Sequence, residues 1–463
     1  MIDYYSWANN GISTMERIPA EVFGLVIKEI TSQETWFWTI NALGRPIADL
    51  KALRLCSKRL ADQVAPYLFN DLFVFVTPES LVRMTAIAQH PHYRHFVKEV
   101  RVFPRHFALE NPFEDKCAYR NYVTDLVFCY NDIEARERRD KSTLTNDQID
   151  RGYDQYVGQR DAQAELLPRV QPLLEDALGR FPSLQSVAVS RFGDESYHGL
   201  PPYAQVRLKP PPTLFPLHQK TLLNLSGDRQ VGLSDPYPSD RESAEETVIV
   251  LLATALSNKN IHNLRLCDGA RHPDLSLDDL SDDEYTLARG LFANLKTLVF
   301  PFPVGGFQPN APAWTDLTTS RARWFDLLKS ASNVETLTLS GSPEHATNWC
   351  TGIEDIYFNA CFPRLRRLKL IDFPASSASI VHLVNHHAST LEELTLEHMR
   401  LDYGSWYDVF SAIRRKGLEV EALYLITLNH YPEYFYPSQQ GAHENKLLNA
   451  FIQEGQPWPS ELP

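Results

Sequence analysis

Residues 391–396 read Leu-Glu-Glu-Leu-Thr-Leu, a short motif with apolar side chains at its first, fourth and sixth positions. The last two apolar positions lie two residues apart, so they share one face of a strand, while the first lies in the turn before it. The same pattern recurs along the chain. Its copies begin at Val97, Leu184, Ile261, Leu295, Val334, Leu365, Leu391 and Val420.

Amphipathic helices are predicted between these copies. One carries Ile380, Leu383 and Val384 on a single face, and another ends in basic residues just before Gly417. From Ile261 onward the copies lie 34, 39, 31, 26 and 29 residues apart. A strand and a helix repeated at such intervals are typical of a leucine-rich-repeat solenoid, so we expect an α/β fold with a parallel concave sheet. The uneven intervals indicate an irregular array.

Length and composition narrow the class of protein. A chain of 463 residues is too long for one compact core, and a hydrophobic content of 43% is that of a folded protein. The net charge of -13 disfavours a nucleic-acid partner, which would require a basic face. We expect no membrane insertion, because neither a secretory signal nor a long apolar run is apparent. Six cysteines without paired spacing indicate an intracellular protein, cytoplasmic or nuclear.

Two long stretches interrupt the repeats. Residues 104–180 are predicted to be a helical insertion in which Pro168 and Pro172 break the helix. Residues 190–247 contain several prolines and are predicted to be a loop insertion. The repeat domain, with both insertions, is expected to span residues 78–463.

The N-terminal part of the chain, residues 15–77, forms a separate pattern. The segment Ile18-Pro19-Ala20-Glu21-Val22-Phe23 is followed by a second predicted helix over 50–64 and then by an apolar strand at 72–76. This combination resembles an F-box, and together with the repeats the chain resembles F-box proteins with degenerate leucine-rich repeats. The spacer at 31–48 is longer than that family usually has.

The resemblance implies that the protein is the non-catalytic substrate-recognition subunit of a Skp–cullin–F-box ubiquitin ligase. The F-box would bind a Skp-type adaptor and the repeats would bind a protein substrate, with no cofactor required, and the chain would be a monomer apart from that complex. Carried over to this sequence, the adaptor contacts would be Ile18, Pro19, Val22, Phe23, Leu50 and Leu53. Alternatively, the F-box only caps a repeat scaffold, because solenoids need capped ends.

The substrate is expected on the concave face, where residues that alternate with the buried leucines point. Arg367 and Lys369 on one predicted strand stand beside Glu393 and Glu397 on the next, so these charges partly neutralise each other. A solvated ladder of charges and a binding surface are equally compatible with this pattern. The candidate substrate-binding residues are Arg265, Arg367, Lys369, Glu393, Glu397 and Tyr424.

The sequence gives little support for catalytic activity or for a metal site. Three histidines lie within residues 90–95, but Pro91 favours a loop over a metal site. The acidic run from Asp278 to Glu284 lacks the spacing of a calcium loop and suits the first turn of a helix instead. No phosphate-binding loop or nucleophile elbow is present in the sequence, so we expect neither a catalytic residue nor a metal ligand.

Overall fold

The fold is taken from a computed structural model of the chain. It describes residues 55–56, 58–103, 115–117, 146–189, 240–257, 261–266, 277, 280–301, 315–341, 362–371, 373–397, 399–423, 426–427 and 440–459. The expected adaptor contacts between Ile18 and Leu53 lie outside these residues, so the helical F-box stays a prediction.

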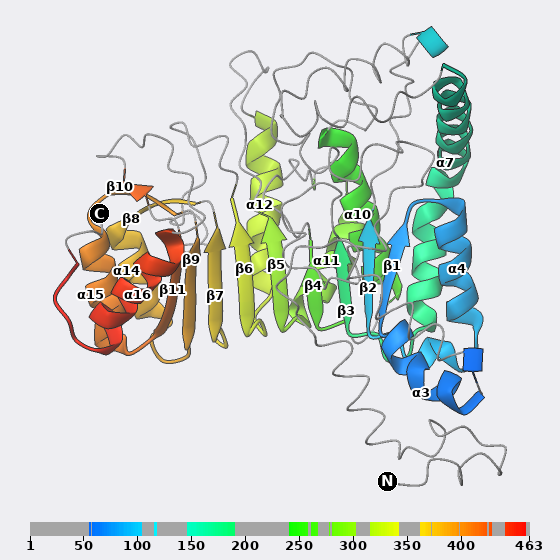
Figure 1. The fold of residues 1–463 in the computed structure, drawn as a ribbon. Helices are drawn as coiled ribbons and strands as arrows, with labels where there is room; N and C mark the ends of the chain where they lie inside the picture. Colours follow the sequence, from blue (N-terminus) through cyan, green and yellow to red (C-terminus); the bar gives the residue numbers. More distant parts are fainter. Residues whose placement is uncertain are drawn as a thin grey trace, which may run out of the picture.

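A single parallel sheet of nine strands runs the length of the described chain (Figure 1). Its strands follow one another in sequence order, and every neighbouring pair is parallel. In order they are β1 (Asp71–Phe75), β2 (Glu99–Phe103), β3 (Ser186–Val189), β4 (Asn263–Arg265), β5 (Thr297–Pro301), β6 (Thr336–Ser340), β7 (Arg367–Ile371), β9 (Glu393–Glu397) and β11 (Glu419–Leu423).

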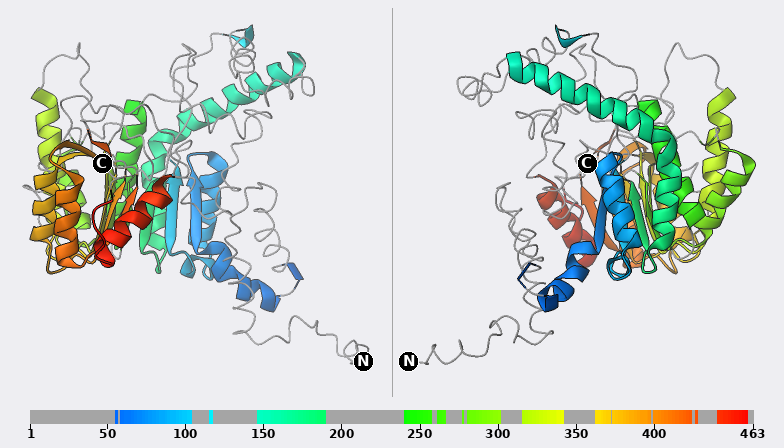
Figure 2. Two further views of the ribbon diagram at one scale, coloured as in Figure 1. Left: turned by 60° about the vertical axis from the view of Figure 1, so that its left-hand side comes forward. Right: turned by 90° about the vertical axis from the view of Figure 1, so that its right-hand side faces the viewer.

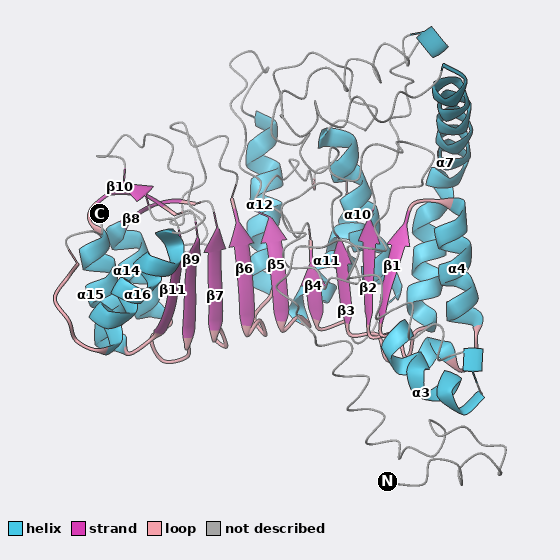
Figure 3. Ribbon diagram, viewed as in Figure 1, coloured by secondary structure: helices cyan, strands magenta, loops and turns pink. Residues whose placement is uncertain are grey.

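A layer of helices covers one face of this sheet (Figure 3). Most strands are preceded by a described helix, so the repeating unit is a helix followed by a strand. Neighbouring helices pack against each other from α4 to α12, and again at α14 and α15. The helices are α3 (Lys58–Phe69), α4 (Pro78–Gln89), α7 (Asn146–Arg180), α10 (Asp240–Ser257), α11 (Asp282–Ala293), α12 (Thr315–Ser330), α14 (Ser377–His386) and α15 (Trp406–Lys416). This is the α/β repeat solenoid that the motif spacing predicts.

The core lies between the sheet and the helix layer. The apolar positions of the first seven motif copies are buried and stand beside one another across the sheet, as Leu337, Leu368 and Leu394 do. The expected register of the eighth copy is wrong, because β11 pairs Val420 with Leu394 and Ala422 with Leu396, the positions that the motif assigns to Leu423 and Leu425. Each such side chain contributes about 1.5–3 kcal/mol relative to an exposed position. A slip of one residue would turn every leucine to the open face, so the alternation sets the register. Aromatic side chains fill the centre of the core, where the rings of Phe300 and Trp324 pack edge to face with centroids 4.6 Å apart.

A second, smaller parallel sheet accompanies the last repeats. It consists of β8 (Pro374–Ser376), β10 (Arg400–Tyr403) and β12 (Ile426–Thr427), each of which follows a strand of the large sheet. Gly404 ends β10 with φ 89°, and a Cβ there would lie 1.8 Å from Ser377 Oγ. Glycine is required at this corner because the chain turns against the start of α14.

The C-terminal edge of the array is covered. Helix α16 (Gln440–Gln453) lies against β11 and α15, and buries Leu448, Phe451 and Ile452. Trp458 then packs on Phe451, with ring centroids 5.2 Å apart. Because an open sheet edge invites pairing with other chains, this helix protects the last repeat.

Several local expectations are confirmed and others are wrong. Helix α15 ends at Gly417, whose φ of 67° is left-handed, and α11 begins with its acidic first turn behind Ser281. The expected break at Pro168 and Pro172 is wrong, because α7 continues through both prolines. The helix is nevertheless bent along its length (Figure 2). Its C-terminal half is buried on the sheet, so it is a helix of the repeat layer that also extends beyond it. Among the described helices, none is long and apolar enough to cross a bilayer.

Candidate interaction surface

The face of the large sheet opposite the helix layer presents the residues that alternate with the buried leucines. The strand register lines them up in rows that cross the sheet. We call this surface the open face. One row reads Asp71, Glu99, Ser186, Asn263, Thr297, Thr336, Arg367, Glu393 and Glu419. The next row reads Phe73, Arg101, Ala188, Arg265, Val299, Thr338, Lys369, Thr395 and Glu421.

An ionic cluster lies at the N-terminal end of the open face. Arg101 donates from Nη2 to Glu99 Oε1 at 2.9 Å, and Arg265 Nη2 lies 4.0 Å from Glu99 Oε2. The Arg101 side chain is 7% exposed and that of Glu99 17%. Burial alone would raise the pKa of the Glu99 carboxyl, but the charges of Arg265 and Arg101 outweigh it and hold that pKa below its ordinary value. Glu99 is therefore ionised at neutral pH.

The C-terminal part of the open face carries a ladder of exposed ion pairs. Arg367 Nε lies 3.0 Å from Glu393 Oε2, and Lys369 Nζ lies 2.6 Å from Glu397 Oε2. The partners are between 23% and 58% exposed, so solvent screens them and each pair contributes at most about 1 kcal/mol. These contacts confirm the neutralisation that the sequence predicts. Because these side chains are partly exposed, a partner protein could reach them by displacing water.

Uncharged side chains fill the centre of the open face. Strands β5 and β6 present Thr297, Val299, Thr336 and Thr338 there, all half-buried. Hydroxyl groups can both donate and accept hydrogen bonds, and the valine offers a small apolar contact. The open face therefore has a charged cluster, a neutral centre and a second charged region in succession.

The structure separates the predicted substrate-binding residues into two groups. Arg367, Lys369, Glu393 and Glu397 form the C-terminal ladder, while Arg265 lies beyond β5 and β6 and belongs to the N-terminal cluster. Tyr424 lies outside the described residues. Sequence reasoning placed Glu99 and Arg101 on this face but missed their contact with Arg265, because that contact crosses β3. The role of these residues in binding stays a prediction.

The N-terminal end of the array carries the described remainder of the F-box-like segment. Helix α3 buries Leu60, Val64 and Leu68 against the first repeat, and β1 is the first strand of the large sheet. Just before α3, Leu55 is 87% exposed, and Tyr67 of α3 is 42% exposed. Residues 58–77 are therefore continuous with the array. Leu55 and Tyr67 leave exposed apolar surface at this end of it.

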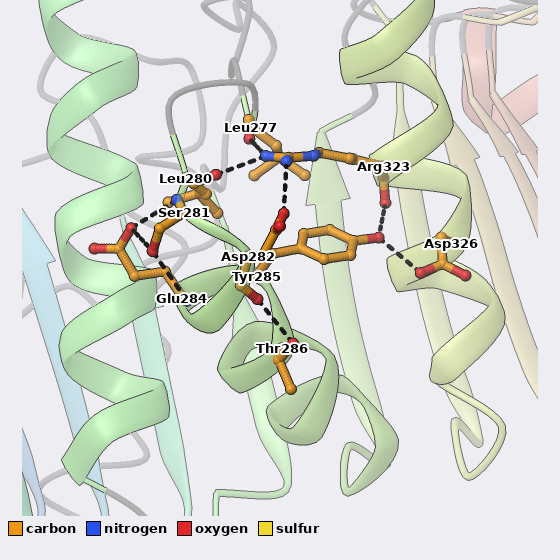
Figure 4. A network of polar contacts seen from close by, with 9 residues as sticks. All are labelled: Leu277, Leu280, Ser281, Asp282, Glu284, Tyr285, Thr286, Arg323 and Asp326. Atoms are coloured by element: carbon orange, nitrogen blue, oxygen red, sulfur yellow. Dashed lines mark hydrogen bonds and ion pairs between the residues drawn. The ribbon is translucent and has the colours of Figure 1, made fainter.

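A polar network outside the open face joins two helices of the outer layer (Figure 4). The Tyr285 hydroxyl donates to Asp326 Oδ2 at 2.8 Å, and the Arg323 guanidinium donates to the carbonyl oxygens of Leu277 and Leu280. Burial, and then the bond to Asp326, raise the pKa of Tyr285, so its phenol stays protonated. The bonds of Tyr285 and Arg323 hold α11 and the segment before it to α12, and the remaining bonds lie within the first turns of α11, so we assign the network a structural role.

Metal binding finds no site in the described part of the chain, where His, Cys, Asp and Glu form no group of three able to hold an ion. His90, in the histidine-rich turn, stacks on Tyr93 at 3.9 Å, and its Nδ1 accepts from the backbone N–H of His92 and Tyr93. This local packing accounts for that histidine without a ligand.

Comparison with known proteins adds little beyond the geometry. No protein-family model matches the sequence, and no curated protein matches it. Among solved structures, the leucine-rich repeat-containing protein LegL7 from Legionella pneumophila is similar, at 12% identity and a TM-score of 0.29. That match covers 84% of this chain and 99% of the other. So loose a superposition carries no argument, and the fold rests on the strand register and helix layer described above.

Proposed function

We propose that this protein is a non-catalytic scaffold that binds a protein partner on its open face, and that it serves a Skp–cullin–F-box ubiquitin ligase as a substrate receptor. The observation that carries the first part is the open face itself. One side of a nine-stranded sheet is covered by helices, while the other presents ordered rows of side chains that are partly exposed from β4 onward and largely buried on β1 to β3, at Phe73, Arg101, Ser186 and Ala188. Solenoids use such extended faces to bind other proteins.

The ligase role is supported by the resemblance of residues 15–77 to an F-box. At the described end of that segment Leu55 exposes an apolar side chain, on the helix face opposite the expected contacts Leu50 and Leu53. Helix α3 follows directly and packs on β1, so an adaptor bound there would be tied firmly to the array. An apolar helix face laid into a groove is a common way for such modules to bind.

The mechanism of such a receptor is proximity. It performs no bond chemistry, and it raises the effective concentration of a substrate lysine near the charged ubiquitin-conjugating enzyme. An adaptor bound beside α3 would lie at the N-terminal end of the array, and the open face extends away from that end. The two partners could therefore be bound at once.

Co-purification of the full chain with a Skp-type adaptor tests the ligase role. We expect a stoichiometric complex that is lost when Ile18 and Leu53 are both replaced by Asp. The matched control is Val82→Asp, which places the same charge on an exposed apolar position of α4 (69% exposed) and should leave the complex intact. If the unmodified chain binds no adaptor, the ligase role is refuted. If the double variant still binds, the contact residues are wrong.

One observation favours the alternative of a capping segment, since α3 and β1 belong to the array. Removal of residues 1–54 separates the two functions. A ligase receptor would lose adaptor binding and keep its thermal stability, because α3 and β1 remain. A cap that includes residues 1–54 would lose stability instead, and the shortened chain would melt early or aggregate.

A further inference from the structure

The ionic cluster of β2, β3 and β4 contains two guanidinium groups and one carboxylate. Arg101 holds Glu99 at 2.9 Å, whereas Arg265 lies 4.0 Å from it, beyond hydrogen-bond distance. Among the described residues, neither arginine has a second carboxylate within ion-pair distance. With Glu99 ionised, these three side chains carry a net charge of +1, and the neighbouring carboxylate of Asp71 lies on the far side of Glu99 from Arg265.

The surplus charge resides on Arg265. Glu99 is on β2 and Arg265 on β4, so their contact crosses β3 above Ser186 and Ala188, both of which are buried. Short side chains on β3 allow this crossing. The Arg265 side chain is 34% exposed and has no other ion pair with a described residue.

A second observation also indicates a missing acceptor. The Nε of Arg101 is buried and has no hydrogen-bond partner among the described residues. Arg101 itself is 6% exposed, and its guanidinium lies 5.9 Å from the centre of the Phe73 ring. Buried donors without partners are rare in folded proteins and call for an explanation.

We propose that Arg265 binds the carboxylate of an Asp or Glu side chain in the protein segment that lies on the open face. This inference rests on the proposed scaffold function and names the chemistry of its partner. Arginine suits the task because its planar fork matches a carboxylate and pairs with both oxygens. One carboxylate would neutralise the cluster. A phosphate carries nearly two charges and would be repelled by Glu99, so the cluster favours the monoanion.

The surroundings of Arg265 limit the neighbours of that acidic residue. Asn263 lies on the same face of β4 as Arg265. The neighbouring strands β5 and β6 present threonines and Val299 on that face. Other charged partner side chains would find no opposite charge there. The acidic residue is therefore expected within a stretch of uncharged residues.

The inference is tested with blocked heptapeptide pools and the immobilised full-length chain. The central residue is Glu, Gln, Lys or phosphoserine, and the other positions are random mixtures of uncharged residues. We expect the Glu pool to be retained about tenfold more than the Gln pool. Arg265→Gln should abolish that preference, and Arg265→Lys should keep part of it. Arg415→Gln, which removes an exposed arginine from α15, should leave it unchanged.

Equal retention of the Glu and Gln pools by the unmodified chain would overturn the inference, whether or not the variants fold. So would an undiminished Glu preference in a folded Arg265→Gln variant. Stronger retention of the phosphoserine pool would overturn the choice of a carboxylate. Adaptor binding is measured separately, so a chain that binds the adaptor but shows no Glu preference refutes this inference alone.

Discussion

The buried ion pair of Arg101 and Glu99 offers the sharpest energetic test of the open face. Their side chains are 7% and 17% exposed and lie 2.9 Å apart. Replacing Arg101 with Met leaves an ionised carboxylate with only the distant Arg265 as partner. Breaking a buried pair in this way costs about 3–5 kcal/mol. We expect about 3 kcal/mol, because Arg265 at 4.0 Å still provides some attraction.

The cost should appear as faster hydrogen exchange of the β2 and β3 amides. A loss of about 3 kcal/mol in local stability accelerates exchange roughly a hundredfold. Adding Glu99→Gln to Arg101→Met removes the stranded charge, so the double variant should recover at least about 2 kcal/mol relative to the sum of the single changes. The matched control is the exposed pair of Arg367 and Glu393, where Arg367→Met should lower the local stability by less than about 1 kcal/mol.

Two results would refute this reasoning. If Arg101→Met changed exchange no more than Arg367→Met, the pair would be solvated rather than buried. If the effects of Arg101→Met and Glu99→Gln simply added, the two side chains would not be coupled, and Glu99 would not hold the arginines in place.

Three further predictions concern stability. Phe300→Ala should cost about 3–5 kcal/mol in thermal unfolding, because it empties a fully buried site beside Trp324; a loss below about 1 kcal/mol would contradict the packing described. Gly404→Ala should destabilise more than Gly417→Ala, since both have positive φ but only Gly404 meets Ser377; equal melting temperatures would show that the corner can shift. Burial, and then His386, lower the pKa of His387 to about 4. Folding should therefore lose up to roughly 3 kcal/mol as the pH falls from about 6.5 to 4, a loss absent in His387→Gln when melting curves are compared.

The large sheet could be predicted from the sequence because its signal is local. Two apolar residues two positions apart, as in Leu394 and Leu396, specify both a strand and the face that it buries. The same alternation placed Arg101, Arg265 and Arg367 on the opposite face. The start of α11 in an acidic turn and the end of α15 at Gly417 could also be predicted, because helix capping depends on a few adjacent residues.

Other features depend on contacts between distant residues and left no local signal. The small sheet of β8, β10 and β12 has strands of two to four residues, which are too short to show an alternation of apolar and polar residues in the sequence. The prolines of α7 were expected to break the helix, yet the packing of Val170 and Leu174 on the core keeps it continuous. The contact of Glu99 with Arg265 requires the register of three strands and a small residue at Ala188.

The central claim is that the open face of the sheet, and not the helix layer, binds a partner protein. Site-specific photo-crosslinking in cells tests it most directly, with the reactive residue placed at Thr338 on the open face or at Arg415 on α15. The account predicts crosslinks to a non-adaptor protein from position 338 and none to that protein from position 415. Crosslinks to a non-adaptor protein from position 415 alone would contradict it.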